Sequence, residues 1–392
     1  MKDATMERLV ADSIPAPRSL ASPAKRALLG VFLFVSLIGL AETGAALIYY
    51  FQIPAQQRDV IELAIGLRQA PTNTVLRFVS HPYLNYVANP TFTYDNGYRP
   101  HNAWGFRDEH CCVPKKPGHI RIVAIGGSTT YGLYFTYDQN VWPALLQEKL
   151  RQKYGDRIEV INAGIPNYTT FELIGLTAMI LPELSPDVVL IHTGLNDAFA
   201  VGYPEEGGAD NRYFRHAWNY TPLSQGLGSA MRASYLVRLI GRYWTSSNTF
   251  SPGDMAGAIQ YPVANGAEMV KHIETANGKY FRRNLQTLVA LCRNMNAVPV
   301  LLNEPVNPAK EEGLDAYYRA VVAAISRNNS IMQELAATNR LLSIDLYSKM
   351  RDPAYFLDAA HETKVGMEKK AEVIAERLAV ALDPLVGSAR AN

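Results

Sequence analysis

The sequence has few cysteines, few charged residues and almost no excess of either charge. Three cysteines in 392 residues cannot form a disulfide framework, and no Cys-x-x-Cys or mixed Cys/His spacing suggests a metal site. A formal net charge of +2 provides no overall attraction to nucleic acid. Charged residues make up 19% and aromatic residues 10%, which excludes a disordered chain, and 27 Gly and 23 Pro are near average usage, which excludes a fibrous one. The sequence therefore predicts a folded chain with no metal and no nucleic-acid partner.

One long apolar run stands near the N-terminus. Residues 27–51 carry a single charge, Glu42. A helix of that length, at about 1.5 Å per residue, exceeds a hydrocarbon core of roughly 30 Å. A cleaved signal peptide, cut near residues 44–46, and a buried core helix are the alternatives. We expect an uncleaved transmembrane helix in contact with membrane lipid, because the run continues past the potential cut. Glu42 is then either tolerated near the outer interface or in contact with a partner membrane protein.

Basic residues are unevenly placed around this run. Arg18, Lys25 and Arg26 precede it, whereas only Arg58 follows within a similar distance. By the positive-inside rule, residues 1–26 form a cytoplasmic tail and the rest of the chain lies outside the cytoplasmic (inner) membrane. This location would also allow a disulfide bond. A bridge from Cys111 or Cys112 to Cys292 would need such an oxidising compartment, and free or buried thiols are the simpler expectation.

The rest of the chain divides into a connector and an α/β domain. Residues 52–118 have many turn signals and aromatic residues, and we expect this connector to pack on the domain that follows. From residue 119 to 383, short apolar strands alternate with helices, interrupted by an insertion at 199–275 that could act as a lid. Residues 384–392 are expected to be a tail. Strands are predicted at 121–125, 158–161, 187–192, 298–302 and 341–345, with helices at 142–154, 171–181, 284–295, 315–337 and 365–382. This alternation predicts a flavodoxin-like three-layer α/β/α sandwich with a parallel sheet of about five strands.

Polar residues and glycines follow the predicted strands, where a parallel sheet binds its ligands. Ser128 follows the first strand, Gly164 the second and Asn196 the third, while Asp358 and His361 precede the last helix. A serine hydroxyl becomes nucleophilic when a histidine takes its proton and an aspartate fixes the histidine tautomer. The backbone N–H groups of Ser128 and Gly164 and the Asn196 amide could then stabilise an oxyanion. We predict catalytic roles for Ser128, Asp358 and His361.

This set of residues resembles the SGNH/GDSL hydrolase superfamily. Its Ser, Gly, Asn and Asp-x-x-His blocks match Ser128 in IGGST, Gly164 in NAGIPNY, Asn196 in GLND, and Asp358 with His361. The connector motif NAWGFR at 102–107 also resembles bacterial membrane-anchored members. The resemblance implies esterase, lipase or acyltransferase chemistry without a metal or organic cofactor.

Other observations set limits on this interpretation. The Asp that the family carries between Gly and Ser is replaced by Gly127, which leaves the nucleophile intact but removes a local hydrogen-bond acceptor. Alone, each motif is also an ordinary turn or helix cap. Tyr131, Tyr168 and Glu304 lie near the same sheet edge and are candidates for the substrate pocket. His192, within an apolar strand, is expected to be a core histidine.

The sequence thus predicts an extracytoplasmic, membrane-anchored serine esterase for O-acyl esters. The narrower hypothesis, that these are O-acetyl esters of envelope glycans, rests on location and family analogy. Two alternatives stay open: an O-acetyltransferase, and a non-catalytic SGNH-fold subunit or binding module of a membrane complex.

Overall fold

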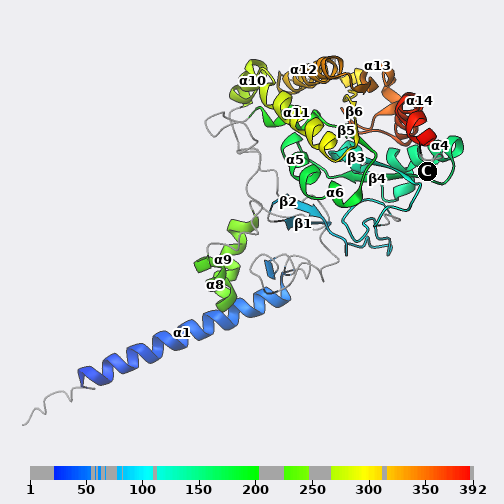
Figure 1. Ribbon diagram of the computed structural model, residues 1–392. Helices are drawn as coiled ribbons and strands as arrows, with labels where there is room; N and C mark the ends of the chain where they lie inside the picture. Colours follow the sequence, from blue (N-terminus) through cyan, green and yellow to red (C-terminus); the bar gives the residue numbers. More distant parts are fainter. Residues whose placement is uncertain are drawn as a thin grey trace, which may run out of the picture.

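The computed structural model contains one long helix that projects from an α/β body (Figure 1). It describes residues 22–53, 58, 61–62, 67, 77–81, 83–108, 113–202, 225–246, 266–310 and 316–388. The projecting helix is α1 (Pro23–Phe51), which has Ser22 as N-cap and a proline in its first turn, both common at helix starts. The expected cytoplasmic tail lies almost wholly outside the described residues.

The body is built on a five-stranded parallel sheet. Its strand order is β4-β3-β5-β6-β7. The strands are β3 (Ile120–Gly126), β4 (Ile158–Gly164), β5 (Val188–His192), β6 (Val298–Leu302) and β7 (Leu342–Ile344). Because β4 returns to one side of β3 and β5 continues on the other, the order reverses between β3 and β5. In such sheets ligands bind outside the carboxyl ends of the strands at this reversal.

Apolar side chains on both faces of the strands explain the three layers. Val123 and Ile125 of β3 face a cluster with α5 (Thr170–Met179), α11 (Lys279–Asn294) and α12 (Ala316–Asn339). Ile122 and Ala124 face the opposite cluster. That second cluster contains α4 (Trp142–Tyr154) and α14 (Lys364–Ser388). The predicted α/β sandwich with a parallel sheet of about five strands is confirmed.

Shorter elements complete the body and connect its layers. They are α3 (Ser128–Tyr131), η2 (Asp138–Asn140), α6 (Leu181–Leu184), α7 (Leu195–Ala200), α10 (Gly266–Thr275), η4 (Pro308–Lys310), α13 (Leu346–Lys349) and η5 (Pro353–Tyr355). The C-terminal helix is longer than expected. The tail expected from residue 384 is wrong at its start, because α14 continues through Pro384 to Ser388 and buries Val386 in the core.

The connector contains a hairpin that the sequence did not indicate. Strands β1 (Phe78–His81) and β2 (Asn85–Ala88) pair antiparallel. Phe78, Tyr86 and Phe106 are buried in the same cluster as one face of the main sheet. In its described part, the connector therefore shares the core of the α/β body.

The insertion does not lie where the lid hypothesis put it. Its helices α8 (Gln225–Ala233) and α9 (Tyr235–Ser246) lie beside α1, away from the sheet (Figure 1). For these helices the lid expectation is wrong, since their apolar residues pack on α1. Helix α10 packs beside α12 instead. Residues 203–224 and 247–265 of the insertion lie outside the described residues.

Helix α1 is long and apolar enough to cross a membrane. A signal sequence near the N-terminus shares this length and composition. Its only buried residues are Ala45 and Tyr49, which excludes the buried core helix. Cys292 is a free, buried thiol, and burial raises its pKa to about 12. Cys111 and Cys112 lie outside the described residues.

Candidate active site

The structure brings together the hydroxyl, the imidazole and the carboxylate that the sequence singled out. Ser128 opens α3 directly after β3, and Asp358 and His361 lie in the loop before α14. His361 Nε2 lies 2.8 Å from Ser128 Oγ, and His361 Nδ1 lies 2.8 Å from Asp358 Oδ2. This order of hydroxyl, imidazole and carboxylate is the one that a nucleophile, its base and a group orienting the base would require.

The Asp358 carboxylate is held by the loop that contains it. Its Oδ1 accepts backbone N–H groups from Ala360 at 2.9 Å and His361 at 2.8 Å. Burial opposes ionisation, but these hydrogen bonds and the His361 ring outweigh it and hold the pKa of Asp358 well below its usual range. Asn307 fixes the loop from the other side, because its side-chain amide donates to the Asp358 carbonyl at 3.0 Å. The carboxylate is therefore preorganised to hold the His361 ring.

Two of the three expected oxyanion donors lie beside the nucleophile. Ser128 is the first residue of α3, where a helical N–H has no intrahelical acceptor. The Asn196 amide lies next to Gly127: a Cβ added at Gly127 would lie 2.5 Å from Asn196 Nδ2. The same amide donates to the Tyr168 carbonyl at 2.9 Å, which fixes its position and leaves its second N–H for another acceptor.

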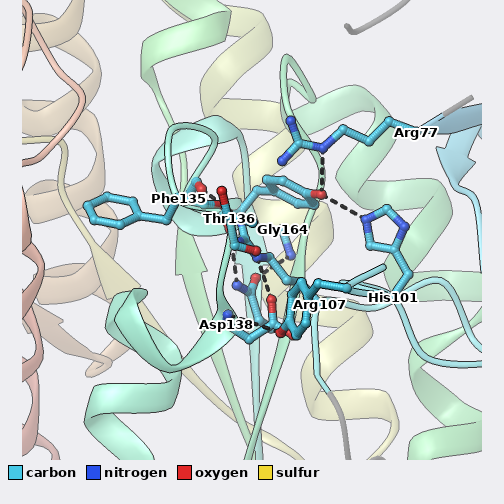
Figure 2. Close-up of polar contacts among 11 residues, drawn as sticks. Arg77, His101, Arg107, Phe135, Thr136, Asp138 and Gly164 are labelled. Carbon is cyan, nitrogen blue, oxygen red and sulfur yellow. Dashed lines mark hydrogen bonds and ion pairs between the residues drawn. The ribbon is translucent and has the colours of Figure 1, made fainter. Parts of the chain in front are cut away.

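Gly164, the third expected donor, does not fit that role. The predicted strand ended at residue 161, but β4 continues to Gly164, which pairs with Gly126. The Gly164 N–H donates to Asn162 Oδ1 at 3.0 Å (Figure 2). A Cβ at Gly164 would lie 2.5 Å from the Tyr131 nitrogen, so the glycine permits α3 to approach β4 closely. We therefore assign Gly164 to packing beneath the nucleophile.

The tight space at Gly127 gives a first prediction. Gly127→Ala should displace the Asn196 amide, because the new Cβ would occupy its position. The φ of −91° at Gly127 is outside the left-handed region, but the 2.5 Å approach to Asn196 Nδ2 forces that amide to move, so we expect a modest loss of stability. If Asn196 is an oxyanion donor, kcat for ester hydrolysis should fall by about 10²-fold. The matched control is Gly387→Ala on α14, where a Cβ meets nothing within 4 Å and the backbone φ is not positive. Unchanged kcat in a folded Gly127→Ala variant would remove Asn196 from the proposed oxyanion hole.

Tyr131 and Tyr168 were candidates for the substrate pocket, and the structure corrects both. Each side chain is fully buried. The Tyr131 hydroxyl lies 2.7 Å from His101 Nε2 and accepts from Arg77 Nε at 3.0 Å (Figure 2). The Tyr168 hydroxyl donates to the Leu84 carbonyl at 3.1 Å. Both rings therefore hold the connector against the body, through contacts that periodicity could not reveal.

Glu304 also faces the protein interior rather than a substrate. Its side chain is buried, and its Oε2 lies 3.2 Å from Nε2 of the fully buried His192. Burial alone would raise the pKa of Glu304, but the attraction of His192 outweighs it and the net direction is downward. His192 Nδ1 lies 3.0 Å from Thr130 Oγ1, so this histidine connects Glu304 to the segment that follows Ser128. The pocket role expected for Glu304 is replaced by a structural one.

Sequence reasoning missed a cation that supports the nucleophile segment. Arg107, in the connector, is buried and pairs with Asp138 at 2.7 Å (Figure 2). Its guanidinium also donates to the carbonyls of Tyr131 at 3.1 Å and Gly132 at 2.6 Å. The segment that follows α3 is thereby tied to the connector. The motif NAWGFR contains this arginine, but only the fold shows what it holds.

Tyr134 is a second residue that the sequence did not indicate. Its ring meets His361 edge-on, with 5.0 Å between centroids, and its hydroxyl donates to Asp358 Oδ2 at 3.4 Å. The side chain is 59% exposed, so it forms an outer wall of the histidine. Within the part of the chain that the structure describes, no three His, Cys, Asp or Glu side chains gather to hold a metal ion.

Comparison with known proteins yields one family and several distant similarities. The model of the GDSL-like lipase/acylhydrolase family matches residues 124–368. An arylesterase of Vibrio mimicus is 29% identical over 94 residues, which cover 24% of this chain and 46% of the relative. The chain thus spans about half the length of this curated relative.

Solved structures with similarity to this chain are distant from it. A putative lipolytic protein of the G-D-S-L family from Desulfitobacterium hafniense is 18% identical, with a TM-score of 0.38, over 66% of this chain and 100% of its own. A lipase/acylhydrolase from Enterococcus faecalis is 20% identical, with a TM-score of 0.39, over 66% and 95%. The matched family model covers more than half of the sequence and includes Ser128, Asn196, Asp358 and His361. The chain belongs to the GDSL-like lipase/acylhydrolase family.

Proposed function

We propose that this chain is a serine ester hydrolase that acts outside the cytoplasmic membrane on O-acyl esters. The observation that carries the proposal is the continuous contact from Ser128 through His361 to Asp358. A non-catalytic subunit would not need this geometry, and the intact contact favours the enzyme over that alternative.

The reaction follows from the geometry of these groups. Ser128 Oγ attacks the ester carbonyl while its proton passes to His361 Nε2, and Asp358 stabilises the imidazolium. The Ser128 N–H and the Asn196 amide stabilise the oxyanion that forms. The alcohol then leaves with the proton from His361, and a covalent acyl-Ser128 remains. Water, activated by the same histidine, attacks this ester and releases the acid.

The proposed location rests on α1 and its flanking charges. The helix meets the length and composition of a membrane span, and Lys25 and Arg26 stand at its N-terminal end. The positive-inside rule then supports a cytoplasmic N-terminus and an extracytoplasmic body. From this location and the family chemistry we infer O-acetyl esters of envelope glycans as the substrate class.

The proposal is tested by acetate release. The purified full chain is incubated with p-nitrophenyl acetate and with O-acetylated envelope polysaccharide, beside the Ser128→Ala variant. Release from both that depends on Ser128 is the expected result. Release from the small ester alone would contradict the glycan substrate, and release from neither would contradict the hydrolase. Acetyl transfer to a sugar hydroxyl in place of free acetate would favour the transferase.

A further inference from the structure

Helix α1 is bare over its first part and covered on one face over its second, where Leu47 and Phe51 remain exposed. From Pro23 to Ala41 nearly every side chain is exposed, including Leu28, Phe32, Leu33, Phe34, Leu37 and Leu40. From Glu42 outward, Ala45 and Tyr49 are buried. The bare part, residues 23–41, is about 28 Å long at 1.5 Å per residue, close to a hydrocarbon core of roughly 30 Å. Lys25 and Arg26 lie in its first turn, from which their long side chains can extend their charges to the inner headgroups. The covered part extends beyond that thickness.

Helices α8 and α9 provide the cover. Tyr49 and Ile53 are buried together with Met231 at the end of α8. The Arg238 guanidinium is buried above the rings of Tyr49, at 5.0 Å, and Tyr235, at 4.6 Å. These contacts mix aromatic, apolar and cationic groups, which is the composition typical of a membrane–water interface.

Glu42 marks the level at which the cover begins. Its carboxylate accepts hydrogen bonds from the Ser234 hydroxyl and from the backbone N–H of Tyr235, at 2.8 Å for the latter. These groups form the N-terminus of α9, where a negative charge is favourable. The one acidic residue of the apolar run is therefore partnered within this chain. A carboxylate and the start of a polar helix are costly at mid-bilayer depth, so this level belongs at the membrane surface.

The outer side of α9 carries apolar residues that the protein leaves open. Leu236 is 41% exposed and Ile240 is 56% exposed, and residues four apart share one face of a helix. Arg232, at the end of α8, is exposed beside the same turn. An apolar stripe flanked by a basic residue suits the boundary between headgroups and acyl chains.

We propose that α8 and α9 form a collar that lies in the outer headgroup layer of the membrane that α1 crosses. Its partner is the outer leaflet, into which Leu236 and Ile240 insert. The packing of α9 on α1, next to the bare part of that helix, favours lipid over a second protein. The collar shifts the hydrocarbon span from residues 27–51 to about residues 23–41 and holds the catalytic body at a set height. The inference rests on the proposed membrane anchoring.

Depth measurements on the full chain in phosphatidylcholine/phosphatidylglycerol vesicles test the collar. Single cysteines at Leu33, Leu40, Leu47, Leu236 and Ile240 carry a nitroxide label, in a Cys111→Ser/Cys112→Ser background that keeps the buried Cys292. Accessibility to oxygen is compared with accessibility to a water-soluble nickel chelate. Val380, 72% exposed on α14, is the aqueous control. We expect the deepest label at Leu33, a shallower one at Leu40, and Leu236 and Ile240 between the levels of Leu40 and Leu47.

Three results would overturn the collar. A maximum depth at Leu40, with Leu47 also in hydrocarbon, would return the span to residues 27–51. Nickel accessibility at Leu236 and Ile240 equal to that at Val380 would place α9 in water. Low accessibility of both positions to oxygen and nickel alike would indicate a protein partner. Failure of the chain to float with the vesicles would instead contradict the anchoring itself.

The Glu42 contact has a separate readout. Glu42→Ala should free the start of α9 and raise the mobility of a label at Leu236 at least twofold, as seen in the spectral line shape. Thr43→Ala is the matched control, because the Thr43 hydroxyl bonds only to the Gly39 carbonyl of its own helix, at 2.8 Å. Equal mobility in both variants would contradict the role of Glu42. Hydrolysis of p-nitrophenyl acetate should be unchanged in either variant, since both positions lie outside the catalytic machinery.

Discussion

Ser128→Ala should lower kcat for ester hydrolysis by about 10⁵–10⁶-fold, the loss seen when a triad nucleophile is removed. The reason is geometric. His361 Nε2 lies 2.8 Å from the Ser128 hydroxyl, and no other hydroxyl is recorded at this nitrogen in the described part of the chain. Stopped-flow or long-time hydrolysis of p-nitrophenyl acetate measures the change, and fluorophosphonate labelling of the serine should disappear with it.

Controls separate catalysis from folding for this prediction. Ser330→Ala removes an exposed hydroxyl on α12 and should keep both labelling and turnover. His361→Ala should match Ser128→Ala within about tenfold, and the double variant should be no worse, because the residues of a triad act as a unit. His272→Ala on α10 is the matched histidine control. Losses that add up fully in the double variant would show that Ser128 and His361 do not share one step.

The fold was predictable because burial on both sides of a parallel sheet leaves a simple pattern. Runs such as Val188–His192 are buried along their whole length, and the sequence shows them as nearly continuous apolar segments. The hairpin β1–β2 was not predictable. Its strands have four residues each, and its stability comes from Phe78 and Tyr86 packing on a core far along the chain. Short strands that depend on distant partners carry little local signal.

The sequence predicted the site residues that a strand end positions. It mispredicted the residues whose role depends on the direction of the side chain. Ser128 and Asn196 follow their strands as the pattern requires. Gly164 was misjudged because the strand continued three residues beyond its apolar run, through Asn162 and Ala163. Tyr131 was misjudged because its long side chain extends to partners in the connector, Arg77 and His101, which the local sequence cannot identify. Its ring faces the connector, while Ser128 faces the histidine.

The insertion shows a different limit of local pattern. Its helix α9 is amphipathic, and amphipathicity indicates that one face is covered but not by what. The cover turned out to be α1, about 190 residues earlier, through Glu42 and Ser234. A lone acidic residue in an apolar helix and a serine before an amphipathic helix are complementary signals. Neither alone identifies the other as its partner.

Asp358→Asn should lower kcat by about 10³–10⁴-fold and also lower stability at neutral pH, because the depressed pKa of this carboxylate means that its charge stabilises the folded state. The asparagine amide can present an N–H to His361 Nδ1, where the carboxylate accepts one. Nε2 would then carry the ring proton and could not accept the proton of Ser128. Asp352→Asn is the matched control, since Asp352 also accepts a backbone N–H, from Ala354 at 2.9 Å, without contacting the histidine. An equal loss in both variants would indicate a general effect on this loop.

The pH dependence of kcat/KM in the wild type tests whether the Asp358 carboxylate stays ionised during catalysis. Hydrogen bonds hold the pKa of Asp358 well below its usual range, so its carboxylate stays ionised far into acid. A depressed folded-state pKa means that this group stabilises the fold above its unfolded-state value, and the contribution is lost only as pH falls through the folded value. An acid limb of kcat/KM centred on the ordinary aspartate value of about 4 is therefore not expected from Asp358. A limb centred near pH 4 that disappears in Asp358→Asn would show that the carboxylate titrates during catalysis and is not held as the structure indicates.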